Sequence, residues 1–143
     1  MPVYQVFSPD NLLSDEQRQQ IVDEITHIHT SNTGAPELFV NVVFTDLPAG
    51  RVFSAGKPSR LSLVIGNIRE GRDIEVRQTM LRQLSAMWVK ITGAPETEIL
   101  LSIQETNPLA AMELGLLFPP AGQEAAWFAK NQDKLAALGI SGS

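Results

Sequence analysis

A five-residue segment that occurs twice constrains the fold of this chain more than any other feature of its sequence. Thr33-Gly34-Ala35-Pro36-Glu37 returns 59 residues later as Thr92-Gly93-Ala94-Pro95-Glu96. A helical pattern precedes each copy, and apolar runs flank both patterns, at residues 3–7, 38–44, 61–65 and 99–103. The chain is therefore interpreted as a strand–helix–strand unit written twice.

Both helical patterns have recognisable ends. Ser14 and Asp73, again 59 residues apart, are good N-caps, while Gly34 favours a C-cap and Pro36 prevents continuation. These signals predict helices over about 15–31 and 74–92. Each helix carries an apolar stripe that we interpret as core rather than as a cofactor site. The stripes comprise Ile21, Val22, Ile25 and Ile28 in the first helix, and Val76, Met80, Leu84, Met87, Trp88 and Ile91 in the second.

Two such units predict an α/β (α+β) fold. A strand–helix–strand unit pairs its strands in parallel through a right-handed crossover. Packed edge to edge, the units give a four-stranded mixed sheet with both helices on one face. If a pseudo-twofold axis relates them, strands 3–7 and 61–65 run antiparallel, which brings the residues after Ile65 close to Pro2.

We predict a single domain with four parts: unit one at 2–45, a linker at 46–60, unit two at 61–104 and a C-terminal arm at 105–143. The linker contains Pro and Gly residues typical of a surface loop or a short hairpin. In the arm, Trp127-Phe128 are expected to act as an anchor, and a helix is predicted over about 124–138.

Composition excludes several classes of function. With 143 residues and 43% hydrophobic content, the chain can form a real core. Eleven basic and 16 acidic residues give a net charge of −5, which argues against nucleic acid or an anionic membrane as a partner. The absence of cysteine excludes disulfides, a thiol nucleophile and thiolate metal sites. No signal peptide or apolar run of about 18 residues is recognisable, so a cytoplasmic location is expected.

Pro2 is the first candidate for chemistry. A small residue after Met1 favours removal of that methionine, which would leave Pro2 with a free secondary amine. An α-amino group has a reference pKa of about 8, and a modest depression makes it a base at neutral pH. The strand formers that follow would hold the amine on a sheet. The alternative is that Pro2 is merely a tolerated second residue.

Arg69 and Arg72 form a second candidate, in a Gly-containing segment that opens the second helix. Guanidinium groups bind carboxylates in bidentate fashion, and a helix start adds a favourable field. The segment matches no nucleotide-binding motif. A solvated charged loop is the alternative.

Two histidines and an acid complete the candidates. His29 faces the apolar side of the first helix, where a hydrogen-bonded buried residue is the common outcome, whereas His27 faces roughly the opposite way. Two histidines at this spacing cannot chelate a metal from one side of a helix, so no metal site is predicted. Glu113 lies in an apolar stretch, where burial would raise its pKa and suit it to proton transfer, although an exposed turn residue is the alternative. Ser102 lacks the context of a nucleophilic serine.

Together these residues resemble the tautomerase superfamily, and specifically its cis-3-chloroacrylic acid dehalogenase group. The superfamily hallmark is a catalytic amino-terminal proline on a doubled β-α-β unit, which Pro2 and the repeat match. The matching segments cover nearly the whole chain and lie at residues 2–4, 48–53, 69–72, 112–115 and 118–128.

The resemblance implies roles for individual residues. Pro2 would act as general acid or base, and His29 would help to hold the substrate. Arg69 and Arg72 would bind its carboxylate, and Glu113 would activate water in dehalogenation. Ser102 stands where the family dehalogenase has a tyrosine, which disfavours efficient water addition.

The resemblance further implies a cofactor-independent homotrimer that acts on a small carboxylate-bearing substrate. Trp88, Trp127 and the two edge strands offer material for an interface. The activity expected is enol–keto tautomerisation of a small 2-oxo acid, with weak hydration or dehalogenation as a side activity. A cis-3-haloacrylate dehalogenase and a non-catalytic carboxylate-binding module are the alternatives.

Overall fold

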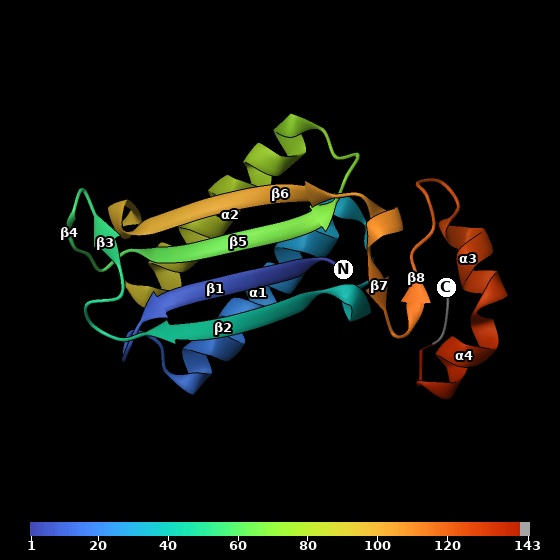
Figure 1. Cartoon of the computed structure of the whole chain (residues 1–143), viewed down its shortest axis with the longest axis horizontal. Helices are drawn as coiled ribbons and strands as arrows, with labels where there is room; N and C mark the ends of the chain where they lie inside the picture. Colours follow the sequence, from blue (N-terminus) through green and yellow to red (C-terminus); the bar gives the residue numbers. More distant parts are fainter. Residues whose placement is uncertain (141–143) are drawn as a thin grey trace.

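A four-stranded mixed sheet forms the centre of the computed structural model, which describes residues 1–140 (Figure 1). The strands, in the order β2-β1-β5-β6, are β2 (Asn41–Leu47), β1 (Val3–Pro9), β5 (Ser62–Arg69) and β6 (Ile99–Thr106). β1 pairs with β2 and β5 with β6 in parallel, while β1 and β5 are antiparallel. The predicted fold is confirmed. Because Val3 lies opposite Asn67, the end of β5 meets the start of β1.

Two long helices, α1 (Asp15–Thr33) and α2 (Ile74–Thr92), cover one face of this sheet (Figure 1). The bounds of α2 are those predicted, whereas α1 continues two residues past its expected end. Both helices end at a glycine of the repeat. Gly34 has φ 72° and donates its N–H to the Thr30 carbonyl, and Gly93 has φ 71° and donates to Val89. The repeated segment therefore encodes the same left-handed helix ending twice.

A short 3₁₀ turn follows each ending, η1 (Glu37–Phe39) and η2 (Glu96–Glu98). The prediction of an apolar strand starting at residue 38 was therefore wrong, since β2 begins at Asn41. Local hydrogen bonds explain the difference, because the Phe39 N–H donates to the Pro36 carbonyl and the Val40 N–H donates to the Glu37 carbonyl. Those two N–H groups are unavailable for a sheet ladder.

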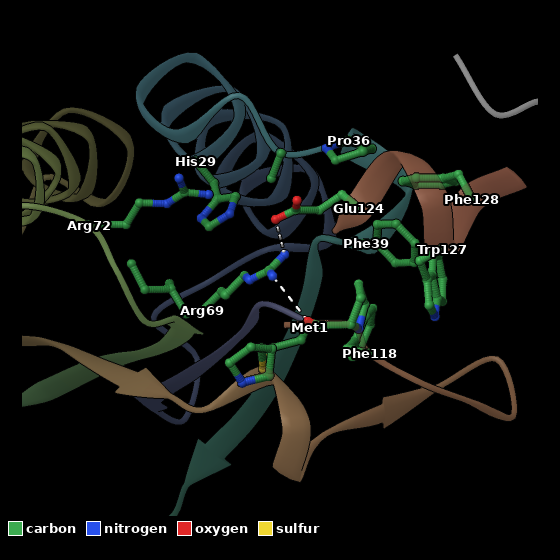
Figure 2. A pocket seen from close by; sticks show the side chains of 14 residues that line it. Met1, His29, Pro36, Phe39, Arg69, Arg72, Phe118, Glu124, Trp127 and Phe128 are labelled. Carbon is green, nitrogen blue, oxygen red and sulfur yellow. Dashed lines mark hydrogen bonds and ion pairs between the residues drawn. The ribbon is translucent and has the colours of Figure 1, made fainter. Parts of the chain in front are cut away.

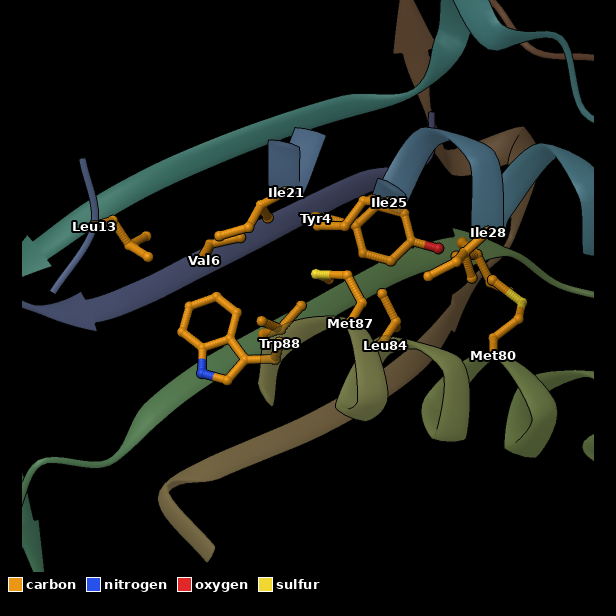
Figure 3. Close-up of a cluster of buried hydrophobic side chains, with 12 residues drawn as sticks. Tyr4, Val6, Leu13, Ile21, Ile25, Ile28, Met80, Leu84, Met87 and Trp88 are labelled. Carbon is orange, nitrogen blue, oxygen red and sulfur yellow. The ribbon is translucent and has the colours of Figure 1, made fainter. Parts of the chain in front are cut away.

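The core lies between the sheet and the helices (Figure 3). Its buried members come from both units and are Tyr4, Val6, Leu13, Ile21, Ile25, Ile28, Val64, Ile68, Met80, Leu84, Met87 and Trp88. Complete burial of Trp88 corrects the expectation that it offers interface material, because it has no exposed surface. Trp88 lies on the apolar face of α2 and packs into the core instead.

The linker and the arm add small elements to this framework. The linker contains a hairpin of β3 (Phe53–Ser54) and β4 (Lys57–Pro58). The arm comprises η3 (Pro108–Ala110), β7 (Met112–Glu113), β8 (Leu116–Leu117), α3 (Glu124–Lys130) and α4 (Gln132–Ala137). The single helix predicted over 124–138 is thus two, because the backbone leaves helical geometry at Asn131. Within residues 1–140, no helix has the length and apolar character needed to cross a membrane.

Aromatic rings fasten the arm to the first unit. Phe39 of η1 contacts Phe118, Trp127 and Phe128, with ring centroids 5.6, 6.3 and 6.1 Å away. The Trp127 indole N–H also donates to the Leu117 carbonyl at 2.8 Å. These contacts confirm the predicted anchor, and they hold α3 over the end of the sheet where β1 starts.

Candidate active site

A cavity lies between this end of the sheet, the C-terminal end of α1 and the arm (Figure 2). It encloses about 80 Å³ of solvent-accessible space, which is room for a few water molecules or one small organic acid. Met1, His29, Arg69, Arg72 and Glu124 contribute its polar wall. The remaining lining is largely apolar and includes Pro36, Phe39, Ile68, Phe118, Trp127 and Phe128.

The two arginines reach the cavity from neighbouring positions: Arg69 is the last residue of β5, and Arg72 lies in the turn between β5 and α2. Glu105 on the neighbouring strand β6 holds this turn in place. Its Oε2 accepts the Gly71 N–H at 2.8 Å, and its Oε1 lies 3.2 Å from Arg77 Nη2. Arg77 in turn donates from Nε to the Arg72 carbonyl at 3.3 Å. Gly71 has φ 102°, a conformation that favours glycine, so the sequence can turn here and present both arginines to one side.

Arg69 and Arg72 have different partners within the cavity. Arg69 Nη1 lies 2.8 Å from Glu124 Oε1, and its Nη2 donates to the Pro119 carbonyl at 3.1 Å. Arg72 extends toward His29 (Figure 2). Among the described residues, no carboxylate lies within ion-pairing distance of the Arg72 guanidinium. Arg72 is therefore the guanidinium available to an incoming anion.

His29 is buried, with 3% of its surface exposed, and lies at the end of the cavity beside Arg72. Burial, with smaller contributions from the charges of Arg72 and the chain terminus, lowers the pKa of His29 from 6.5 to about 4. Tyr4 Oη is 2.8 Å from His29 Nδ1, and burial raises the pKa of the Tyr4 phenol. At neutral pH both groups are therefore uncharged.

These charge states define the hydrogen bond between the two rings. No other acceptor for the Tyr4 hydroxyl occurs among the described residues, so the hydroxyl donates to Nδ1. A neutral imidazole that accepts at Nδ1 carries its proton on Nε2. His29 can then act as a hydrogen-bond donor to a ligand.

The chain terminus closes the third side of the site. Pro2 is buried one residue behind Met1, and its carbonyl accepts the Asn41 N–H at 3.1 Å. The Met1 amino group pairs with Glu113 Oε1, while Glu113 Oε2 accepts from Asn41 Nδ2 at 2.8 Å. With Met1 in place, the nitrogen of Pro2 belongs to a peptide bond.

The structure brings most of the predicted site residues to one place. His29, Arg69 and Arg72 line the cavity, Pro2 lies directly behind Met1, and Glu113 contacts the terminus without lining the cavity. Ser102 does not line it. Ser102 lies on β6 between the core-facing residues Leu101 and Ile103, and so belongs to the opposite face of the sheet.

Sequence reasoning missed several residues of the site. Tyr4 had a detectable signal, because alternation in β1 places it on the helix-covered face, two residues from Pro2. Asn41, Glu105 and Glu124 had none, since each acts through a partner that is distant in the sequence. Within residues 1–140, no three His, Asp or Glu side chains lie close enough together to hold a metal ion.

A protein-family comparison agrees with this arrangement. Residues 1–132 match the family Tautomerase_3, described as "Putative oxalocrotonate tautomerase enzyme". The chain belongs to this family. The predicted resemblance to the tautomerase superfamily is therefore confirmed. No curated protein matches the chain significantly.

Solved structures extend the comparison. N1, a member of the cis-3-chloroacrylic acid dehalogenase family, is 28% identical with a TM-score of 0.84, covering 94% of this chain and 99% of its own. Native Ps01740 is 33% identical with a TM-score of 0.76, covering 78% and 99%. The R7 fused 4-OT asymmetric trimer, 21% identical with a TM-score of 0.72 and coverage of 80% and 94%, shares the fold. This tautomerase-family chain thus has dehalogenase-like relatives.

Proposed function

We propose that this member of the tautomerase superfamily catalyses enol–keto tautomerisation of a small 2-oxo acid, without a cofactor. One observation carries the proposal: a neutral hydrogen-bond donor, His29, and a free guanidinium, Arg72, face one small cavity at the start of β1. A carboxylate bound by a guanidinium leaves the adjacent oxygen of the substrate for His29. That oxygen changes from enol to ketone in the reaction.

Pro2 is the proposed acid–base group. Removal of Met1 would convert its peptide nitrogen into a free secondary amine at the wall that Met1 now forms. The amine would accept the proton from the enol oxygen and deliver a proton to the neighbouring carbon. The C–O bond then becomes the carbonyl, and the electron pair of the carbon–carbon double bond forms the new C–H bond.

Tyr4 is proposed as a positioning residue. By donating to Nδ1, its hydroxyl would keep the His29 proton on Nε2, where it can stabilise charge that develops on the substrate oxygen. Arg69 would assist Arg72 in holding the carboxylate by adding positive charge beside it, while it keeps its ion pair with Glu124.

Ketonisation of phenylenolpyruvate, followed by ultraviolet absorbance, tests this function. We expect the Met1-free protein to accelerate the reaction, and Arg72→Ala to reduce kcat/KM roughly 100-fold, as is typical when one group that stabilises transition-state charge is removed. The matched control is Arg82→Ala, since Arg82 is exposed on α2, the helix that follows Arg72. No acceleration by the Met1-free protein, or equal rates for the two variants, would contradict the proposal.

Weak hydration or dehalogenation is proposed as a side activity, because Glu113 sits beside the terminus and could activate water there. A cis-3-haloacrylate dehalogenase is the alternative main function, supported by the similarity to N1. The variant Glu113→Gln distinguishes the tautomerase from the dehalogenase. The proposed division of roles predicts that this variant loses hydration and keeps tautomerisation.

A non-catalytic carboxylate-binding module is the remaining alternative. Binding of small carboxylates by a protein that never turns them over would favour it.

We also infer that the chain is one tautomerase-like domain that assembles as a homotrimer in the cytoplasm. A protein of the same fold, R7 fused 4-OT, is described as a trimer. The face of the sheet opposite the helices is available for such contacts, because Val43 and Leu100 are exposed there. Trp127 remains available at the arm, where it is partly exposed.

A further inference from the structure

Glu124 places a carboxylate inside the cavity, and the tautomerisation proposed above makes no use of it. Its Oε1 lies 2.8 Å from Arg69 Nη1, with 45% of the glutamate side chain and 20% of the arginine side chain exposed. The adjacent anchor Trp127 fixes the helix α3 that carries this residue. The arm therefore supplies the cavity with a carboxylate of its own, directed at one of the two arginines (Figure 2).

This contact makes the two arginines unequal. Arg69 already has a carboxylate partner, whereas Arg72 has none within ion-pairing distance among the described residues. A hydrogen bond from its own backbone N–H lowers the pKa of Glu124, and the Gly122 N–H and both arginines lower it as well, so it is ionised at neutral pH. The Met1 amino group is balanced by its partner Glu113, and His29 is neutral, so two arginines and Glu124 leave one positive charge in the cavity. One ligand carboxylate balances it.

We propose that Glu124 makes the site selective for ligands with a single carboxylate, by occupying Arg69 and repelling a second anionic group. The inference rests on the proposed function and specifies the substrate class of the same site. A dicarboxylate would have to displace Glu124 from Arg69 or place a like charge beside it. The wall formed by Phe39, Phe118 and Phe128 offers such a group no charged partner. An apolar tail suits that wall.

A purely structural role for Glu124 is the competing explanation. In that role the ion pair would only pin α3 to the end of β5, and its loss would weaken all ligands alike. A half-exposed ion pair contributes little stability, so the two explanations differ mainly in selectivity. Selectivity between two ligands of the same shape is therefore the quantity to measure.

Crotonate and fumarate form a suitable pair, because fumarate has a carboxylate where crotonate has a methyl group. We would measure both affinities by isothermal titration calorimetry at fixed ionic strength and pH 7.5, for the wild type and for Glu124→Gln. Asp133→Asn serves as the control, since it removes the same charge from an exposed position on α4 of the same arm. Glu124→Ala provides a second variant in which no amide can bind either ligand.

We expect the wild type to bind crotonate at least about tenfold more tightly than fumarate. Both Glu124 variants should bind fumarate at least about tenfold more tightly than the wild type does, with crotonate changing less than about threefold, while Asp133→Asn matches the wild type. Equal changes for both ligands, an unchanged fumarate affinity, or no binding of either ligand by any protein would overturn the proposal. Binding needs no turnover, so a protein that selects crotonate but fails to ketonise phenylenolpyruvate would refute the proposed function alone.

Discussion

His29 shows how burial adjusts a single residue for its task. A histidine on the surface is partly protonated near neutral pH, and a charged ring beside Arg72 would be repelled. Burial at the end of α1 keeps the ring neutral, and Tyr4 sets which nitrogen holds the proton. The property that suits His29 to donate a hydrogen bond to a substrate therefore comes from its surroundings.

The lowered pKa of His29 predicts a dependence of stability on pH. The unfolded chain binds a proton at His29 below about pH 6.5, whereas the folded chain does so only near pH 4. The contribution of His29 to the free energy of unfolding is therefore fully present above pH 6.5. It is lost as the pH falls toward 4, which lowers the free energy of unfolding by up to about 3 kcal/mol. Urea unfolding at pH 7 and pH 5 measures this change.

His29→Asn should flatten the dependence, whereas His27→Asn, at an exposed position on the same helix, should retain it. An equal dependence in the two variants would show that other groups cause it.

Residues could be predicted from the sequence where a local pattern revealed them. Arg69 and Arg72 lie three positions apart at a helix start, and the helical period of α1 turned His29 inward. Glu124 lies 55 residues from Arg69, and no local period links them. Its place in the cavity depends on how the arm folds back, which the sequence does not reveal residue by residue.

At the scale of elements, the strand pair β1–β5 places Tyr4 directly against Gly66. The two residues are register partners, and a Cβ built at Gly66 would lie 2.6 Å from Tyr4 Cε1. The ring has no room to move aside, because it is fully buried and its hydroxyl bonds His29. Glycine in the middle of this strand thus permits the close approach of an aromatic ring to a backbone.

Gly66→Ala is accordingly predicted to destabilise the fold by roughly 1–3 kcal/mol, the usual cost of overpacking a core. It should also displace Tyr4 from His29 and reduce tautomerisation. Denaturant unfolding and kcat/KM together check this. Val64→Ala, on the same face of β5, should cost stability by leaving a cavity yet keep more of the activity. Wild-type activity in Gly66→Ala would contradict the positioning role of Tyr4.

Elements were predictable to the extent that their signals are local. The caps and apolar stripes predicted the positions of the two long helices, and the repeat predicted the strand–helix–strand order of each unit. The strand predicted from residue 38 failed because hydrogen bonds from Phe39 and Val40 to preceding carbonyls outweighed an apolar run. The predicted helix over 124–138 failed because its sequence pattern did not reveal the break at Asn131.

For the whole molecule, the uncovered face of the sheet is the feature that calls for a partner. Both long helices pack on the other face (Figure 1), and Val43 is 51% exposed on the edge strand β2. Sedimentation equilibrium should give a particle of three times the 15.6 kDa chain mass. Val43→Glu should shift it toward monomer, while Leu138→Glu, a similar change on the arm, should not. A monomeric wild type would contradict the proposed trimer.

The central claim is that the amine of Pro2 transfers the proton, and one measurement tests it most directly. The ketonisation rate of phenylenolpyruvate would be compared for the native protein and Pro2→Gly, with the intact mass of each sample showing whether Met1 is absent. The account predicts a clear rate for Met1-free native protein and a loss of most of that rate in Met1-free Pro2→Gly. Equal rates for the two, or a full rate with Met1 retained, would contradict it.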